Sequence, residues 1–125
     1  MADTIRIGIV GCGRIAGADH IPGYLKARGC EITALCAPRA GQFDVLEKKF
    51  PKLKGAARFK KDTDLYASGL VDAVSICTPN DLHYPQTVAA CKAGLHVLCE
   101  KPMAGSLEQT TKMINAAKRA GVILQ

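Results

Sequence analysis

The segment from Ile5 to Ala16 constrains the fold more than any other part of this chain. It reads Ile-Arg-Ile-Gly-Ile-Val-Gly-Cys-Gly-Arg-Ile-Ala, an apolar run that ends in a glycine turn and leads into a helical pattern. This order predicts a strand, a tight turn and the N-terminus of a helix. Gly11 permits a backbone turn that a Cβ atom would obstruct, and the small residue Ala16 lets the helix pack closely on the strand.

The spacing Gly11-x-Gly13-x-x-Ala16 also has a chemical consequence. A glycine at position 13 lets the backbone come close to a pyrophosphate. The free N–H groups and the positive dipole end of the following helix would then face that anion. The segment therefore predicts dinucleotide binding. A βα turn with a purely structural role is the alternative, because glycine turns are common.

Length and composition indicate one globular domain. The chain has 125 residues, of which 48% are hydrophobic and 22% charged, as in soluble globular proteins. No apolar run approaches the roughly 20 residues that a membrane span needs. The N-terminus has no basic segment followed by an apolar one, so no signal peptide is predicted and a cytoplasmic location is expected.

The six cysteines form no C-x-x-C pair, so neither a disulfide framework nor a metal site is expected. Cys12 stands at a predicted helix N-terminus, where a thiolate is favoured. Without a partner cysteine, packing near the cofactor is the preferred interpretation for it, and redox reactivity the alternative.

The net charge of +6 is unevenly distributed, because residues 48–61 carry seven Lys and Arg residues and no acid. A nucleic-acid-binding patch is one interpretation. Only Phe50 and Phe59 interleave as stacking partners, so a solvated surface is preferred. Neither a nucleic acid nor a membrane is an expected partner.

Apolar segments alternate with helical ones along the chain, which is typical of βαβ units on a parallel sheet. We expect an α/β fold with a doubly wound parallel sheet, a Rossmann fold of strand order 3-2-1-4-5-6. Pro22 predicts a kink or a fresh start in the first helix. The expected strands are 5–10, 31–37, 57–60, 73–77, 96–99 and 122–124, and the expected helices are 15–27, 40–50, 64–68, 82–93 and one that begins after a capping box at Ser106.

Ligands in such sheets bind outside the carboxyl ends of the strands, at the switch point between strands one and four. The loops there cover residues 11–14, 37–39, 78–83 and 100–102. We expect these four loops to converge on one site.

Three motifs in these loops make the chain resemble the N-terminal domain of the glucose–fructose oxidoreductase / inositol dehydrogenase / rhizopine-catabolism (Gfo/Idh/MocA) family. They are Gly11-x-Gly13-x-x-Ala16, Thr78-Pro79-Asn80-x-x-His83 and Glu100-Lys101-Pro102-Met103-Ala104. The resemblance covers essentially all 125 residues and implies an NAD(P)-dependent oxidoreductase acting on sugars, polyols and related alcohols or ketones. It makes residues 1–125 the dinucleotide-binding domain, without the substrate domain of the family. A sugar-like substrate would therefore need that second domain, and a full-length parent would be a homo-oligomer.

The resemblance also implies roles for individual residues. Lys101 is the predicted catalytic residue, beside the nicotinamide and hydrogen-bonded to the substrate oxygen, and Pro102 is expected to follow a cis peptide. Glu100 would accept a hydrogen bond from a ribose or be a solvated acid. His83 would reach the nicotinamide end or simply be exposed. The predicted cofactor contacts are Gly11, Cys12, Gly13, Arg14, Ile15, Ala37, Arg39, Thr78, Pro79, Asn80, His83, Glu100, Lys101 and Pro102.

The end of the second strand bears on the choice of cofactor. An NAD site places a carboxylate there, about 20 residues after the glycine turn, whereas this chain has Ala37-Pro38-Arg39. Without that carboxylate, Arg39 can pair with a 2′-phosphate. We therefore predict NADP, with NAD as the alternative if both bind through the pyrophosphate alone.

Two functions of different classes follow. The first is the cofactor domain of an oxidoreductase that transfers hydride between nicotinamide and a sugar- or polyol-like alcohol or carbonyl. The alternative is a stand-alone nucleotide-binding or redox-sensing module without turnover.

Overall fold

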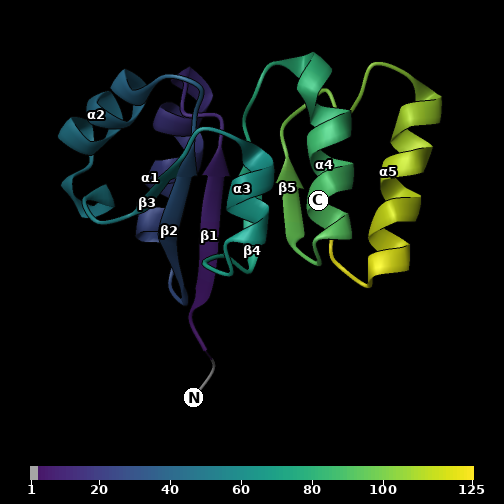
Figure 1. Cartoon of the computed structure of the whole chain (residues 1–125), viewed down its shortest axis with the longest axis horizontal. Helices are drawn as coiled ribbons and strands as arrows, with labels where there is room; N and C mark the ends of the chain where they lie inside the picture. The colour runs from purple at the N-terminus through teal and green to yellow at the C-terminus, as the bar shows by residue number, and fades with distance from the viewer. Residues whose placement is uncertain (1–2) are drawn as a thin grey trace.

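The computed structural model describes residues 3–125 and contains one parallel sheet. Its five strands lie in the order β3-β2-β1-β4-β5 (Figure 1), as the sequence predicts for the first five. The strands are β1 Ile5–Val10, β2 Cys30–Cys36, β3 Ala57–Phe59, β4 Ala73–Ile76 and β5 His96–Cys99. The crossover from β3 to β4 passes over β2 and β1, which places the switch point between β1 and β4.

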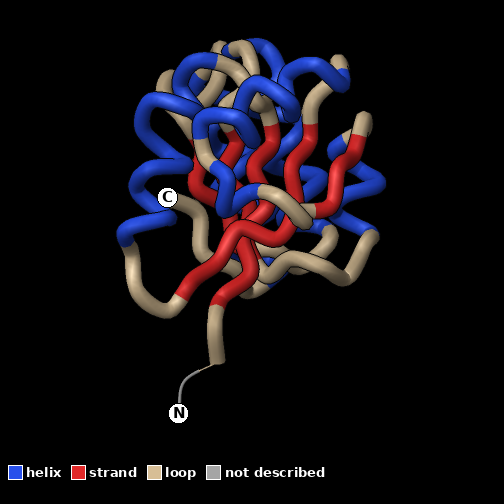
Figure 2. Tube along the Cα trace, turned by 90° about the vertical axis from the view of Figure 1, so that its left-hand side faces the viewer, coloured by secondary structure: helices blue, strands red, loops and turns tan. Residues whose placement is uncertain are grey.

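Helices cover both faces of the sheet (Figures 1 and 2). They are α1 Ile21–Lys26, α2 Ala40–Lys49, α3 Asp62–Ala67, α4 His83–Lys92 and α5 Leu107–Ala120. One apolar cluster joins Ile7 and Ile9 of β1 to residues of α1 and α2. The other joins Val10 and the inner residues of β4 and β5 to α3, α4 and α5. Burial on both faces explains why the strands read as nearly continuous apolar runs.

The first helical region begins with a turn at residues 14–15, continues as a π-helical turn over Ala16–His20 and becomes α1 at Ile21. Pro22 lies in the first turn of α1, where its missing N–H costs nothing. The helix type changes just before this proline, but His20 and Ile21 keep right-handed helical backbone angles, so the chain passes the junction without the fresh start that the sequence predicts.

The capping box before α5 is confirmed in part, because Ser106 Oγ accepts a hydrogen bond from Gln109 N. The Gln109 side chain reaches Gly105 N instead of Ser106 N. The apolar residues of this helix predict that Met113, Ile114 and Ala117 point inward, and Met113 and Ala117 are indeed buried. Ile114 is instead 41% exposed, because one residue along a helix rotates the side chain by about 100°.

The sixth strand is also a correction. Residues 122–124 form no strand, and only Leu124 makes an isolated parallel bridge to Val97. Val97 N donates to Ile123 O, and Gln125 N donates to Val97 O. The segment therefore lies beside β5, where a sixth strand belongs, but its ladder is too short to count as a strand.

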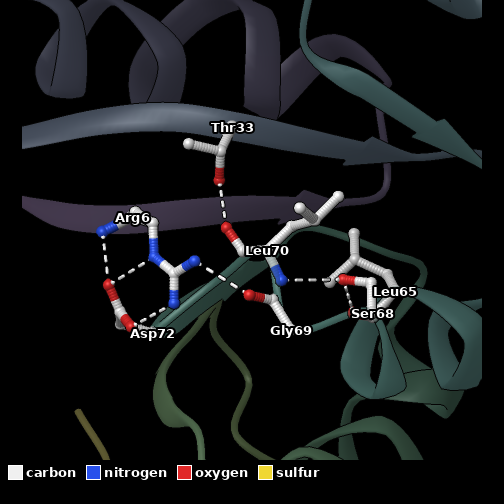
Figure 3. A network of polar contacts seen from close by, with 7 residues as sticks. All are labelled: Arg6, Thr33, Leu65, Ser68, Gly69, Leu70 and Asp72. Atoms are coloured by element: carbon white, nitrogen blue, oxygen red, sulfur yellow. Dashed lines mark hydrogen bonds and ion pairs between the residues drawn. The ribbon is translucent and has the colours of Figure 1, made fainter.

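At the amino ends of β1 and β4, a network of polar contacts joins the two strands (Figure 3). The Arg6 guanidinium donates to both carboxylate oxygens of Asp72, at 2.8 and 3.1 Å, and to Gly69 O at 2.8 Å. Arg6 N donates to the same carboxylate at 2.8 Å. This network lies at the edge of the sheet opposite the predicted ligand site.

Within residues 3–125, no helix has the length and apolar character that a membrane crossing requires. The same residues contain no group of three His, Cys, Asp or Glu side chains that could hold a metal ion. All six cysteines are free thiols.

Candidate functional site

The carboxyl ends of the strands are joined by a row of backbone hydrogen bonds. In each one, the first residue after a strand donates its N–H to the last residue of the neighbouring strand. In sheet order these bonds run from Ala37 N to Phe59 O (3.0 Å), Gly11 N to Cys36 O (2.9 Å), Cys77 N to Val10 O (2.7 Å) and Glu100 N to Ile76 O (3.0 Å). The four predicted loops therefore leave the sheet side by side, and the loop after β3 lies beside them.

The two glycines of the first turn differ in what surrounds them. Gly11 has a φ of +92°, and a Cβ there would lie 2.8 Å from backbone atoms of Cys77 and Thr78. Only glycine fits, because the loop after β4 approaches this closely. A Cβ on Gly13 would meet nothing within 4 Å. The space over Gly13 is thus open to a ligand, whereas Gly11 is required by the fold itself.

A cavity of ≈ 630 Å³ lies along this row. It is lined by residues 11–15, Ala37, Arg39, Thr78 and Pro79, all of them predicted contacts. Three of the four predicted loops therefore meet in one cavity, at the switch point between β1 and β4.

Cys12 lies in this cavity as a packed, uncharged thiol. Its Sγ donates to Cys36 O at 3.3 Å, and burial raises the pKa of the Cys12 thiol to about 12. The thiol therefore stays protonated at neutral pH, which supports the packing interpretation over redox reactivity.

Sequence reasoning missed other residues of this cavity. Lys60 and Lys61, assigned to a solvated surface, line it together with Gln42 and Asp62. The predicted strand order contained the signal, since the loop after the third strand must lie beside the loop after the second. The two aromatics of the basic segment are not free for stacking, because Phe59 and Phe50 pack against the two cores.

Gln42 lines the cavity and carries a buried polar atom without a partner in the described part of the chain. Its Oε1 is buried and accepts no hydrogen bond from residues 3–125. An orphaned buried acceptor costs free energy unless a donor reaches it. The carboxamide is therefore available to a hydroxyl or amine of a bound ligand.

His83 is buried, which contradicts the interpretation that it is simply exposed. The residue is 1% exposed and does not line the cavity, and a contact with the nicotinamide end stays a prediction. Nδ1 lies 2.8 Å from Pro102 O and Nε2 lies 2.8 Å from Thr78 O. The first turn of α4 buries the ring between two loops, so His83 ties the Thr78 loop to the Pro102 loop.

Glu100 is held by protein groups at both oxygens. Oε1 lies 2.8 Å from His20 Nε2, and Oε2 accepts from Lys101 N at 3.1 Å. The hydrogen bond from His20 lowers the pKa of the Glu100 carboxyl. Behind it, His20 Nδ1 lies 3.2 Å from Ser75 Oγ, which in turn lies 2.6 Å from the Tyr24 hydroxyl. This chain fixes the carboxylate that precedes Lys101, and Glu100 is not simply a solvated acid.

Lys101 is exposed, and the Lys101–Pro102 peptide is cis, as expected. Lys101 borders a second cavity of ≈ 520 Å³, between the end of β5 and α5, which Met103 and Ile114 also line. Asn80 is exposed at the start of the 3₁₀ turn Asn80–Leu82. The fourth loop is therefore joined to the first cavity through His83 and the β4–β5 bond but does not line it.

The chain is similar to known oxidoreductases. A model of an oxidoreductase family with an NAD-binding Rossmann fold, GFO_IDH_MocA, matches residues 5–125. The D-glucoside 3-dehydrogenase of Escherichia coli K12 is 33% identical over 123 residues, which are 98% of this chain and 34% of that protein. The chain thus spans about a third of the length of this curated relative.

Two solved structures also resemble this chain in sequence and fold. The WlbA dehydrogenase of Bordetella pertussis, in complex with NADH and UDP-GlcNAcA, is 35% identical with a TM-score of 0.86, over 97% of this chain and 36% of that one. The 3-ketoreductase KijD10 of Actinomadura kijaniata, in complex with NADP and TDP-benzene, is 29% identical with a TM-score of 0.88, over 98% and 36%. All three proteins are dehydrogenases or reductases, and none supports the alternative of a module without turnover.

Proposed function

Because the chain belongs to the Gfo/Idh/MocA oxidoreductase family, we propose that residues 5–125 bind a nicotinamide dinucleotide along the carboxyl edge of the sheet. The observation that carries this proposal is the cavity at the switch point, built on a glycine turn whose second glycine faces open space. Hydride transfer to or from a sugar- or polyol-like alcohol or carbonyl is the reaction it serves.

The residues present fit such a cofactor. Gly13 leaves room for a pyrophosphate against the backbone, and the helix beyond it makes its first bond from Gly17 N to Gly13 O. The N–H groups ahead of that bond have no partner inside the helix and would face the phosphates of a bound dinucleotide. Gln42 Oε1, buried and unpartnered, would accept a hydrogen bond from a hydroxyl of the nucleotide.

The other loops position the rest of the molecule. Thr78, Pro79 and Asn80 follow β4 and contact the ribose and phosphate side. Glu100 has two protein partners but retains lone pairs for a ribose hydroxyl. Pro102, also a proposed cofactor contact, shapes the turn beside the nicotinamide, and its carbonyl oxygen lies 2.8 Å from His83 Nδ1.

Lys101 is the catalytic residue of this proposal. When bound, the nicotinamide supplies or accepts hydride at its C4 atom. The Lys101 ammonium donates a hydrogen bond to the substrate oxygen, and in oxidation its neutral amine takes the proton of the hydroxyl. General acid–base help of this kind contributes about 10²–10⁴-fold to rate. The bonds that hold Glu100 and Pro102 fix the backbone on either side of this lysine.

Substrate contacts and oligomer formation belong to this proposal as well. We assign residues 1–125 to cofactor binding and expect the substrate contacts to come from the part of the relatives that this chain does not match. A homo-oligomer is proposed for the full-length protein. Six free thiols fit a reducing compartment, and we place the protein in the cytoplasm.

The preferred cofactor of this proposal is NADP. Ala37 occupies the position where an NAD site has a carboxylate, and Arg39 lines the same cavity. A charge-assisted hydrogen bond to a 2′-phosphate contributes about 1.5–3 kcal/mol, which corresponds to tenfold or more in affinity. Arg39→Ala is expected to reduce the preference for NADP over NAD.

Calorimetric titration of the 125-residue chain tests the function. Both dinucleotides are expected to bind, NADP more tightly, and no sugar or polyol is expected to be turned over. If neither dinucleotide binds at millimolar concentration, the proposed function is wrong. Tighter binding of NAD than of NADP refutes the preference while leaving the function in place.

A further inference from the structure

The loop after β3 brings two lysines to the end of β2. Ala37 N donates to Phe59 O, the last residue of β3, at 3.0 Å. Lys60 and Lys61 follow Phe59 directly, and Arg39 follows Ala37 by two residues. The register of β2 and β3, with Cys36 opposite Phe59, therefore makes these two exit loops neighbours at the same edge.

These cations line one cavity. Arg14, Arg39, Lys60 and Lys61 all contribute to the ≈ 630 Å³ cavity, and Asp62 is the acid among its lining residues. Four positive charges against one negative leave a surplus of three. A groove with such a surplus concentrates anions by its field.

The surplus is not used inside the protein. None of the ion pairs found within residues 3–125 includes Arg14, Arg39, Lys60 or Lys61. Arg58, only two residues before Lys60, is instead paired with Asp44 at 3.1 Å and Glu47 at 2.6 Å. Arg58 of β3 therefore pairs with two acids of α2. Lys60 and Lys61, the next two cations along the chain, line the cavity without an ion pair to any described residue.

We propose that Lys60 and Lys61 form, with Arg39, the site that recognises the 2′-phosphate of NADP. This assignment rests on the proposed function and names a specificity determinant within that site. A phosphate monoester carries a charge of about −1.5 to −2 at neutral pH, which one guanidinium does not neutralise. Arg39 supplies a planar fork from the β2 side, and the lysines supply point charges from the β3 side.

The alternative place for these lysines is beside the pyrophosphate, which NADP and NAD share. The two placements differ in what removal of the charge does. Loss of a 2′-phosphate contact weakens NADP alone, whereas loss of a pyrophosphate contact or of the general field weakens both cofactors.

The test is the ratio of the dissociation constants for NAD and NADP, measured by titration in wild type and in the double variant Lys60→Gln/Lys61→Gln. We expect NADP affinity to fall about tenfold and NAD affinity to stay within about twofold. The matched control is Lys52→Gln/Lys54→Gln, which removes the same charge from exposed lysines of the same segment that do not line this cavity. It is expected to leave the ratio unchanged.

The outcomes separate this assignment from the function beneath it. Equal weakening of both cofactors, or an unchanged ratio in the Lys60/Lys61 variant, overturns the 2′-phosphate assignment while dinucleotide binding stands. Wild type that binds both cofactors equally also overturns it. If wild type binds neither, the proposed function fails and this assignment fails with it.

Discussion

The two edges of the sheet use charge in opposite ways. At the amino edge, Arg6 is satisfied by Asp72 and Gly69, with four hydrogen bonds between 2.8 and 3.1 Å (Figure 3). At the carboxyl edge, Arg39 and Lys60 line a cavity and enter no ion pair within the described part of the chain. A charge with a partner inside the protein stabilises the fold. A charge without one remains available to a ligand.

The backbone at the carboxyl edge is nevertheless firmly held. Hydrogen bonds of 2.7–3.0 Å join the first residue after each of four strands to the last residue of a neighbouring strand, and the His83 ring lies between the loops that follow β4 and β5. The edge therefore combines a fixed frame with free cations. A frame that is ordered before binding lowers the entropic cost of binding.

The largest expected effect concerns Lys101. In a longer form of this protein that turns over a sugar-like substrate, Lys101→Ala should lower kcat by about 10²–10⁴-fold and change cofactor affinity little. Steady-state kinetics with a parallel cofactor titration measure both quantities. Near-wild-type turnover with weakened cofactor binding would show that the lysine only binds. The amino-edge variant Asp72→Asn, far from the site, is the control and should leave kcat unchanged.

The next test separates fold from ligand site within the glycine turn. Gly11→Ala forces an alanine into a φ of +92° with its Cβ 2.8 Å from the Cys77 and Thr78 backbone. The conformation alone costs about 1–3 kcal/mol, and the clash adds to it, so thermal stability should fall strongly.

In Gly13→Ala the new Cβ meets no atom within 4 Å, and the variant should keep its stability within about 0.5 kcal/mol. Its dinucleotide affinity should drop about tenfold or more, because the methyl group occupies the space for the pyrophosphate. A stable Gly11→Ala variant, or a Gly13→Ala variant with normal affinity, would break the distinction.

Much of this edge could be predicted because its residues act through local rules. The glycine turn after β1, the proline at the start of α1 and the strand order follow from backbone sterics and the handedness of crossovers. Gly11 was expected for its turn, and the structure adds the reason that sequence alone lacks: the backbone of Thr78, 67 residues away, lies against it.

What sequence reasoning missed depends on contacts between distant segments. Lys60 read as part of a solvated basic run, because nothing local shows that its loop lies beside the end of β2. The burial of His83 was missed as well, because the two carbonyl oxygens beside its ring lie in loops whose positions the sequence does not show. The Arg6–Asp72 network spans 66 residues and has no sequence signature. The roles of Lys101 and Glu100 came from resemblance to a family and stay predictions until they are measured.

Two histidine variants, one at each edge of the sheet, compare the stability of the two edges directly. His83→Leu removes the two ring nitrogens that lie 2.8 Å from the carbonyl oxygens of Thr78 and Pro102. A neutral imidazole donates through one nitrogen at a time, so the variant takes a donor from one of these oxygens, at a cost of about 1–3 kcal/mol for an unsatisfied buried group. His96 lies at the amino edge, is exposed, and accepts one bond, from Ile123 N at 3.0 Å. His96→Leu should therefore cost less than His83→Leu in chemical denaturation. If the two variants unfold alike, His83 does not hold the loops together.

The smallest effect is a pH dependence at the amino edge. The hydrogen bonds from Arg6 lower the pKa of the Asp72 carboxyl to about 2. A carboxyl whose pKa is lower in the folded than in the unfolded chain stabilises the fold above its unfolded pKa, and this contribution is lost as the pH falls through the folded pKa. Asp72→Asn keeps an acceptor for Arg6 but removes the charge. The melting temperature of the variant should thus lie below that of wild type near pH 7, and the gap should close between about pH 4 and pH 2.

Because the Asp72 carboxylate is 41% exposed, solvent screens the ion pair and the gap in melting temperature should be small. The gap should narrow further in high salt. Asp81→Asn, at an exposed acid in the loop after β4, should show no comparable gap. A gap that persists at pH 2 would mean that the Asp72 side chain stabilises this edge through hydrogen bonds and not through its charge.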